Sequence, residues 1–140
     1  MGEMVDRTDG RPKGESEKIT INLGYVDLGH VDLLVREGFY NNRTDFIRTA
    51  IRNQLERHAE AAGKSIRRMQ LDLGIRHISR TDLETARDQG ERLEIRVLGL
   101  ATIAADVSPE LAAETIASLT VLGALQASAA VKTVLADRIH

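Results

Sequence analysis

The sequence predicts an α+β protein built in two parts. The N-terminal part is a strand followed by two helices, which we expect to form an intertwined dimer. The C-terminal part is a small module of about two to three strand-return repeats, arranged like a solenoid. Three observations support this: strict polar–apolar alternation over residues 18–23, two helical patterns after it, and a 24-residue repeat further along the chain.

Composition limits the class of protein. Of the 140 residues, 42% are hydrophobic but only 3% are aromatic, so the cores must be aliphatic and rich in alanine. There is no Cys, which excludes disulfides and thiolate metal sites. The N-terminus is polar and charged, and the most apolar stretch, about 115–131, is interrupted by Thr, Ser, Gln and Gly. We therefore expect a cytoplasmic protein without a membrane partner.

Charge and composition divide the chain into four expected regions. They are a disordered arm at 1–17, a first domain at 18–62, a linker or partial repeat at 63–92, and a repeat-containing oligomerisation or effector module at 93–140. Residues 18–68 hold nine Arg or Lys against six Asp or Glu, a net charge of +3 in a chain of net charge −2. A polyanion would therefore bind to this middle segment.

Two helices are predicted after the strand. The first runs from about Asp27 to Glu37, and Gly38 is suited to end it. The second begins at Asn42, a good N-cap residue, with Asp45 placed to act as a capping-box partner. We expect this second helix to reach about residue 62 and to end at Gly63.

The C-terminal part contains an internal repeat. Residues 97–99 (Val-Leu-Gly) recur as residues 121–123, and a fainter copy stands at residues 73–74. We expect strands at 93–103 and 119–127, each followed by a helical or coiled return. Ser108 and Pro109 are typical of a helix start. Because such units cannot bury their own faces, we expect them to stack, in this case on another chain.

A single short strand with two helices cannot enclose a core, whereas two copies can. Their strands would form a two-stranded ribbon over four helices. The expected dimer core consists of Ile19, Ile21, Leu23, Leu34, Phe46, Ile47 and Ile51. The outward side chains, Lys18, Thr20 and Asn22, are suited to base edges in the DNA major groove. The free N–H groups near Asn42 to Thr44 would hold a phosphate.

These residues carry a resemblance to a known family. Residues 18–57, with KITINL, the first helix, a turn and NRTDFIRTAIRNQL, resemble the ribbon-helix-helix domain of the Arc/MetJ/CopG superfamily of bacterial regulators. The resemblance implies an obligate homodimer that binds double-stranded DNA and often represses transcription. By position, it assigns base contacts to Lys18, Thr20 and Asn22. It assigns phosphate contacts to Asn42, Arg43 and Thr44.

Two other functions stay open at this stage. Proteins with this front domain also serve as antitoxins, so a toxin is an alternative partner. The third interpretation is a DNA-anchored assembly protein whose repeats at 93–140 join dimers into higher oligomers. The gene neighbourhood would distinguish an antitoxin from a regulator. The oligomeric state of the C-terminal part would show whether it is an assembly module.

The sequence does not favour an enzyme, a cofactor or a metal. No Ser/His/Asp arrangement, phosphate loop or paired-carboxylate site is visible. The four His residues, at 30, 58, 77 and 140, lack the spacing of metal ligands. We therefore predict a nucleoid-associated regulator that acts by occupying DNA rather than by catalysis.

Overall fold

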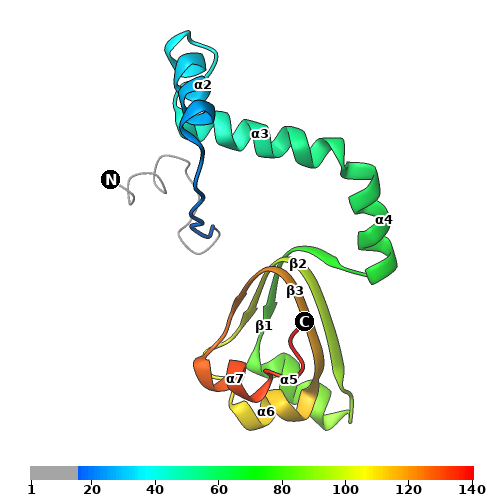
Figure 1. Cartoon of the computed structure of the whole chain (residues 1–140). Coiled ribbons are helices and arrows are strands. Elements are labelled where there is room, and N and C mark those ends of the chain that lie inside the picture. The colour runs from blue at the N-terminus through cyan, green and yellow to red at the C-terminus, as the bar shows by residue number, and fades with distance from the viewer. Residues whose placement is uncertain (1–15) are drawn as a thin grey trace. The chain divides into compact units, whose positions relative to one another are not determined.

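A computed structural model of the chain describes residues 16–140. These residues fall into two compact units, which we call the N-terminal unit (residues 17–65) and the C-terminal unit (residues 66–140) (Figure 1). The arm expected at 1–17 falls almost wholly on residues 1–15, which lie outside the described part of the chain.

The N-terminal unit consists of an extended segment and two helices. Residues 16–24 have no regular secondary structure in the single chain. The helices are α2 (Tyr25–Arg36) and α3 (Arg43–Arg57). Both predicted helices are therefore present, with the first beginning two residues earlier than expected.

The turn between α2 and α3 follows the residues that predicted it. Gly38 adopts a positive φ of 87°, and the next N–H, that of Phe39, donates to the Leu34 carbonyl at 3.0 Å. This is the hydrogen-bond pattern of a Schellman C-cap. Asn42 is the N-cap of α3, and its side chain accepts from the Asp45 N–H at 2.8 Å. The Asp45 carboxylate accepts from the N–H of residue 41 rather than residue 42, so the reciprocal cap reaches one residue further back.

The prediction that Gly63 ends the second helix is wrong. α3 stops at Arg57, and α4 (Ala59–Met69) follows directly and runs through Gly63. One glycine inside a helix costs only about 1 kcal/mol, which its neighbours can offset. The helix ends instead at Gln70, which has a φ of 55°, with the Leu71 N–H donating to the Ile66 carbonyl at 3.0 Å.

The C-terminal unit alternates strands and helices. In chain order they are β1 (Asp72–Ile78), α5 (Arg80–Asp88), β2 (Leu93–Ile103), α6 (Pro109–Thr115), β3 (Ile116–Gln126) and α7 (Ala129–Val134). The segment 63–92 thus holds the end of α4, a strand and a helix. The second predicted repeat strand begins at Ile116, three residues before Leu119, because α6 passes into β3 without a loop.

The three strands form one parallel sheet in the order β1-β2-β3. Its register pairs Gly74 with Gly99, and Gly99 with Gly123. The residues on either side pair likewise, so the Val-Leu-Gly segments at 97–99 and 121–123 lie next to each other. Each passage through strand and helix therefore makes one coil, stacked on the coil before it.

A column of glycines runs across this sheet. Gly74, Gly99 and Gly123 have φ values of 108°, 138° and 125°, in the region that favours glycine. A Cβ on Gly99 would lie 2.1 Å from the Gly74 carbonyl oxygen, and a Cβ on Gly123 would lie 2.0 Å from that of Gly99. Figure 1 shows β2 and β3 bent midway, as such a residue inside a strand produces. We call these three residues the glycine column.

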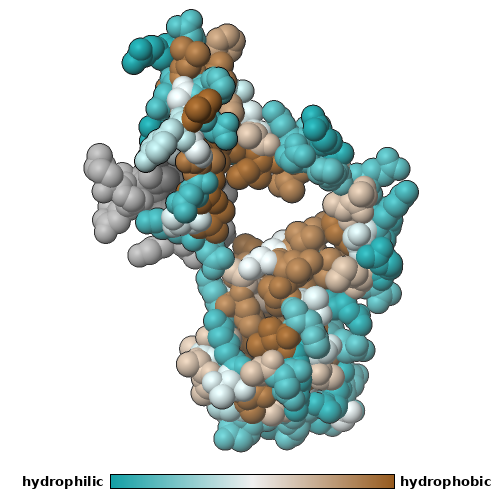
Figure 2. Space-filling view, viewed as in Figure 1, coloured by the Kyte–Doolittle hydropathy of each residue, from teal (hydrophilic) through white to brown (hydrophobic). Residues whose placement is uncertain are grey.

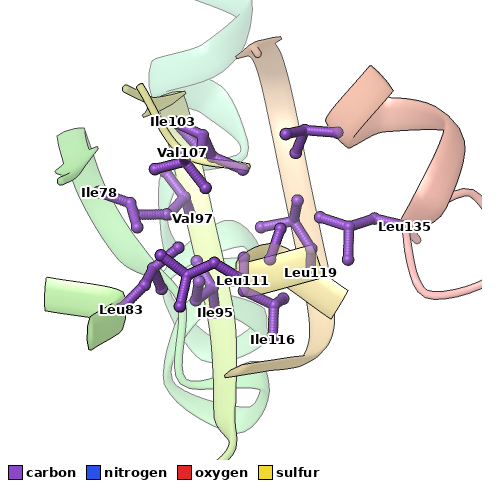
Figure 3. Close-up of a cluster of buried hydrophobic side chains, with 13 residues drawn as sticks. Ile78, Leu83, Ile95, Val97, Ile103, Val107, Leu111, Ile116, Leu119 and Leu135 are labelled. Carbon is purple, nitrogen blue, oxygen red and sulfur yellow. The ribbon is translucent and has the colours of Figure 1, made fainter. Parts of the chain in front are cut away.

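The helices cover the concave side of the bent strands and enclose the core (Figure 1, Figure 3). Alternate β2 residues, Ile95, Val97, Ala101 and Ile103, point inward and are at most 5% exposed. The other buried members of this cluster are Ile78, Leu83, Val107, Leu111, Ala112, Ile116, Leu119, Val131 and Leu135. The core is thus aliphatic, as composition required.

Serine caps begin all three helices of this unit. Ser79, Ser108 and Ser128 each accept a hydrogen bond from the N–H three residues later. The predicted start at Ser108 and Pro109 is confirmed. Because each cap satisfies an N–H that would otherwise lack a partner, the chain can turn sharply from strand into helix.

The last residues are held against β3 and α6. The Arg138 guanidinium donates to the carbonyls of Ala113 at 2.6 Å and Ile116 at 2.9 Å. Ile139 forms a parallel bridge with Leu119, whose N–H and carbonyl bond to residues 138 and 140. Residues 138–140 therefore occupy the outer edge of β3 at its first half.

Candidate nucleic-acid interface

The N-terminal unit has almost no core of its own. Val31, at 6% exposed, is its one buried hydrophobic residue among those described. Large apolar side chains are instead exposed, including Ile19, Ile21, Leu23, Leu33, Phe39, Ile51 and Leu55. Figure 2 shows this hydrophobic surface along the extended segment and on α3. A folded unit with this much exposed apolar surface is typical of one that packs against a partner.

The expected dimer-core residues differ in exposure. In the extended segment Ile19 is 73% exposed, Ile21 57% and Leu23 42%. Leu34, Phe46 and Ile47 are half-buried between α2 and α3, and the Phe46 ring packs edge-on against Tyr40 at a centroid distance of 5.0 Å. Ile51, one turn after Ile47, is 48% exposed. The apolar row therefore continues from the helix pair onto surface that the single chain does not cover.

Lys18, Thr20 and Asn22 are exposed and alternate with the apolar side chains of the extended segment. In an extended backbone, successive side chains point to opposite faces. The three polar side chains therefore share one face when the segment is a strand, and the three apolar ones share the other. These polar residues are neighbours along one extended segment. No other strand of the described residues pairs with that segment.

The start of α3 presents the second set of predicted residues. Asn42, Arg43 and Thr44 are all exposed. The Asn42 side chain is occupied as the N-cap, where it accepts from the Asp45 N–H. The first N–H groups of a helix have no acceptor within it. The backbone of Arg43 and Thr44 is therefore the part of this site suited to an anion.

Arg43 is engaged in an ion pair that the sequence did not predict. Its guanidinium makes two hydrogen bonds to the Asp32 carboxylate, at 2.8 and 2.9 Å, which tie α3 to α2. These bonds lower the pKa of Asp32 below its ordinary value and raise the pKa of Arg43. Both side chains are about half exposed, so this pair orients the guanidinium in water rather than in a core. Eleven residues separate the partners, and no local pattern marks such a contact.

Residues 16–140 contain neither a cluster of metal-binding side chains nor a membrane-spanning helix. No three or more His, Cys, Asp or Glu side chains there gather in a way that could hold a metal ion. The same stretch contains no helix with the length and apolar character needed to cross a membrane.

Comparison with known proteins agrees with this geometry. The profile of the Ribbon-Helix-Helix transcriptional regulator family matches residues 14–132. The match covers the extended segment, both helices and most of the C-terminal unit. Neither the curated proteins nor the solved structures gave a match.

Proposed function

The chain belongs to the ribbon-helix-helix transcriptional regulator family, and from this premise we propose that two copies bind one DNA operator and repress transcription by occupying it. Residues 18–23 of the two chains pair as an antiparallel ribbon that enters the major groove. The single observation that carries the proposal is the alternation in this segment. Ile19, Ile21 and Leu23 are exposed and need a partner, while the residues between them are polar.

The ribbon gives each polar residue a task. Asn22 can make paired hydrogen bonds to adenine, Lys18 suits the acceptors of guanine, and Thr20 can contact a thymine methyl or donate a bond. The backbone at Arg43 and Thr44 takes a flanking phosphate. Because phosphate contacts release counterions, the affinity falls as salt concentration rises.

Selection of bound sequences from a random DNA pool tests the proposal with the full-length protein. Enrichment of one short palindromic or tandem site is expected. Asn22→Ala should then weaken binding to that site by about 1 to 3 kcal/mol and relax the preference at one base pair. Asn53→Ala, an exposed Asn on α3 outside the proposed contacts, is the matched control. Equal affinity for Asn22→Ala and Asn53→Ala would contradict base reading.

A pair of neighbouring substitutions separates dimerisation from DNA contact. Ile21→Asp places a charge in the shared core and should yield monomers that bind no DNA. Thr20→Asp places the same charge on the opposite face, so the dimer should persist while DNA binding is lost. Sedimentation and a binding titration read the two effects. A stable dimer of Ile21→Asp that still binds the operator at micromolar concentration would overturn the ribbon.

A further inference from the structure

Among residues 16–140, no strand pairs with the outer edge of β1 in the C-terminal unit. We propose that β1 of one chain pairs antiparallel with β1 of a second copy, about a twofold axis at Gly74. The inference rests on the proposed function in one respect: a dimer of N-terminal units holds two C-terminal units close together. Such a tether raises the effective concentration of one edge near the other.

The first support is the state of the edge itself. β1 pairs with β2 along one side only, because it is the first strand of the sheet. Its outward side chains Leu73 and Ile75 are 66% and 60% exposed. An exposed edge strand with apolar side chains is a template for another strand, and proteins usually cover or protect it.

The second support is the sequence of β1, which complements itself. In an antiparallel pair centred on Gly74, Asp72 lies opposite the partner's Arg76, and Leu73 lies opposite the partner's Ile75. Opposite charges and apolar pairs directly across two strands both stabilise the pairing. If the pair were centred on Ile75 instead, Asp72 would lie opposite the partner's Ile78, and Arg76 would lie opposite the partner's Gly74. The charges therefore select one register.

The third support is the space beside Gly74. A Cβ at Gly99 or Gly123 would strike the carbonyl of the strand before it, whereas a Cβ at Gly74 would meet nothing within 4 Å. The position that a neighbouring strand fills elsewhere in the glycine column is open here. The space beside Gly74, where a partner backbone would approach, is therefore open for at least 4 Å around an added Cβ.

The opposite edge of the sheet does not offer the same opportunity. Residues 138–140 bond to β3 through the Leu119 N–H at 2.9 Å and the Leu119 carbonyl at 2.8 Å. Stacking β3 of one chain on β1 of the next would have to displace this segment. A twofold β1 pair uses the same surface from both chains, and so the assembly closes when β1 joins the same two chains as the ribbon.

Charged residues on an edge strand can also serve to prevent pairing. Guarding residues of one sign would repel a second copy in any symmetric register. Here Asp72 and Arg76 carry opposite signs and already form an ion pair within the chain at 3.1 Å. Across a twofold axis they meet as attracting partners. The pattern therefore favours association.

Disulfide trapping in the full-length protein tests the pairing, because the chain has no native Cys. Leu73→Cys and Ile75→Cys are made separately, one of them with a tag that changes its size. The two are mixed in urea, refolded together and oxidised. The mixed disulfide should form about ten-fold faster than a link between two copies of either variant, because only residues 73 and 75 lie directly opposite.

Matched controls use the equivalent outward positions on β3. Leu122 and Ala124 occupy the same register positions as Leu73 and Ile75. Leu122→Cys mixed with Ala124→Cys should show no preferred link. A link between Leu73→Cys and Leu122→Cys as fast as that between the two β1 variants would indicate head-to-tail stacking and would overturn the proposal. Equal, slow oxidation of every pair would overturn it too.

Reversing the charges on β1 provides an independent test of the pairing. Asp72→Arg should slow the mixed disulfide several-fold, and adding Arg76→Asp should restore it, because the double change exchanges the signs and keeps the attraction. DNA binding is measured on the same samples. Absent trapping with intact operator binding would refute the β1 pair and leave the proposed function standing. Trapping without operator binding would do the reverse.

Discussion

Replacing Gly99 by Ala should destabilise the C-terminal unit far more than replacing Gly90 by Ala does. Both glycines have positive φ, 138° and 69°, so both variants carry backbone strain. At Gly90 an added Cβ meets nothing within 4 Å, but at Gly99 it lies 2.1 Å from the Gly74 oxygen. The difference between the two variants therefore reflects the close approach of β1 and β2 together with the larger strain at φ 138°.

The magnitude follows from the distance. An ordinary close C···O contact is about 3.3 Å, so the two strands must separate by roughly 1.2 Å near Gly99. That movement breaks about two ladder hydrogen bonds, at about 1 kcal/mol each. Strain at φ 138° adds about 1 to 3 kcal/mol. The loss of about 3 to 5 kcal/mol compares with about 4 to 11 kcal/mol for a unit of this size.

Urea denaturation followed by circular dichroism is the assay, because the chain lacks Trp. Gly90→Ala should lower the free energy of unfolding by about 1 to 2 kcal/mol, as expected for Ala in the left-handed region. Gly99→Ala should cost at least about twice as much or abolish the cooperative transition. Equal midpoints for the two variants would mean that β1 moves aside freely, and would refute the close packing of the glycine column.

Three further outcomes are expected for the C-terminal unit. Gln70→Gly should raise the urea midpoint, with a gain of up to about 1 kcal/mol, because glycine adopts the left-handed conformation at the end of α4 without the steric cost of a side chain. An unchanged or lower midpoint would contradict this. Arg138→Ala should cost about 2 kcal/mol through the loss of two hydrogen bonds from a charged donor, while Arg138→Lys should recover part of the loss. Hydrogen bonds from Ser79, first that of its backbone N–H and then that of its side chain, lower the pKa of Asp82. The stability that this cap contributes is therefore present above the ordinary Asp pKa and is lost as pH falls through the lowered pKa. Carboxyl NMR titration should place the Asp82 midpoint below that of an unpaired Asp, and Asp82→Asn should remove this part of the acid sensitivity.

The sequence predicted those elements whose signals are local. Gly38 and Asn42 mark the turn between helices through their own backbone and side-chain preferences. Ser108 marks a helix start in the same way, and the strand at Leu93–Ile103 has the predicted bounds. Each of these depends on residues within a few positions of one another.

Features set by distant contacts were missed. The ion pair of Asp32 with Arg43 joins two helices and leaves no local pattern. β1 was not identified as a full strand, because as an edge strand it exposes most of its residues and shows no buried alternation. Gly63 was misplaced because its neighbours tolerate a glycine inside α4. The predicted contacts at Lys18, Thr20 and Asn22 stay predictions, since they require a second chain and DNA.

The matched register of the coils has a consequence for changes in chain length. Gly74, Gly99 and Gly123 occupy equivalent places, so one whole coil could be duplicated or removed and its flanking strands would still find the same neighbours. Each such event would lengthen or shorten the module by one strand spacing, about 4.8 Å. Insertions inside a strand would break the alignment of the glycines, whereas the connections between strands already absorb one residue, because Gly74 and Gly99 are 25 residues apart and Gly99 and Gly123 are 24. The C-terminal unit is thus free to vary in whole-coil steps, while every step keeps its bend in place.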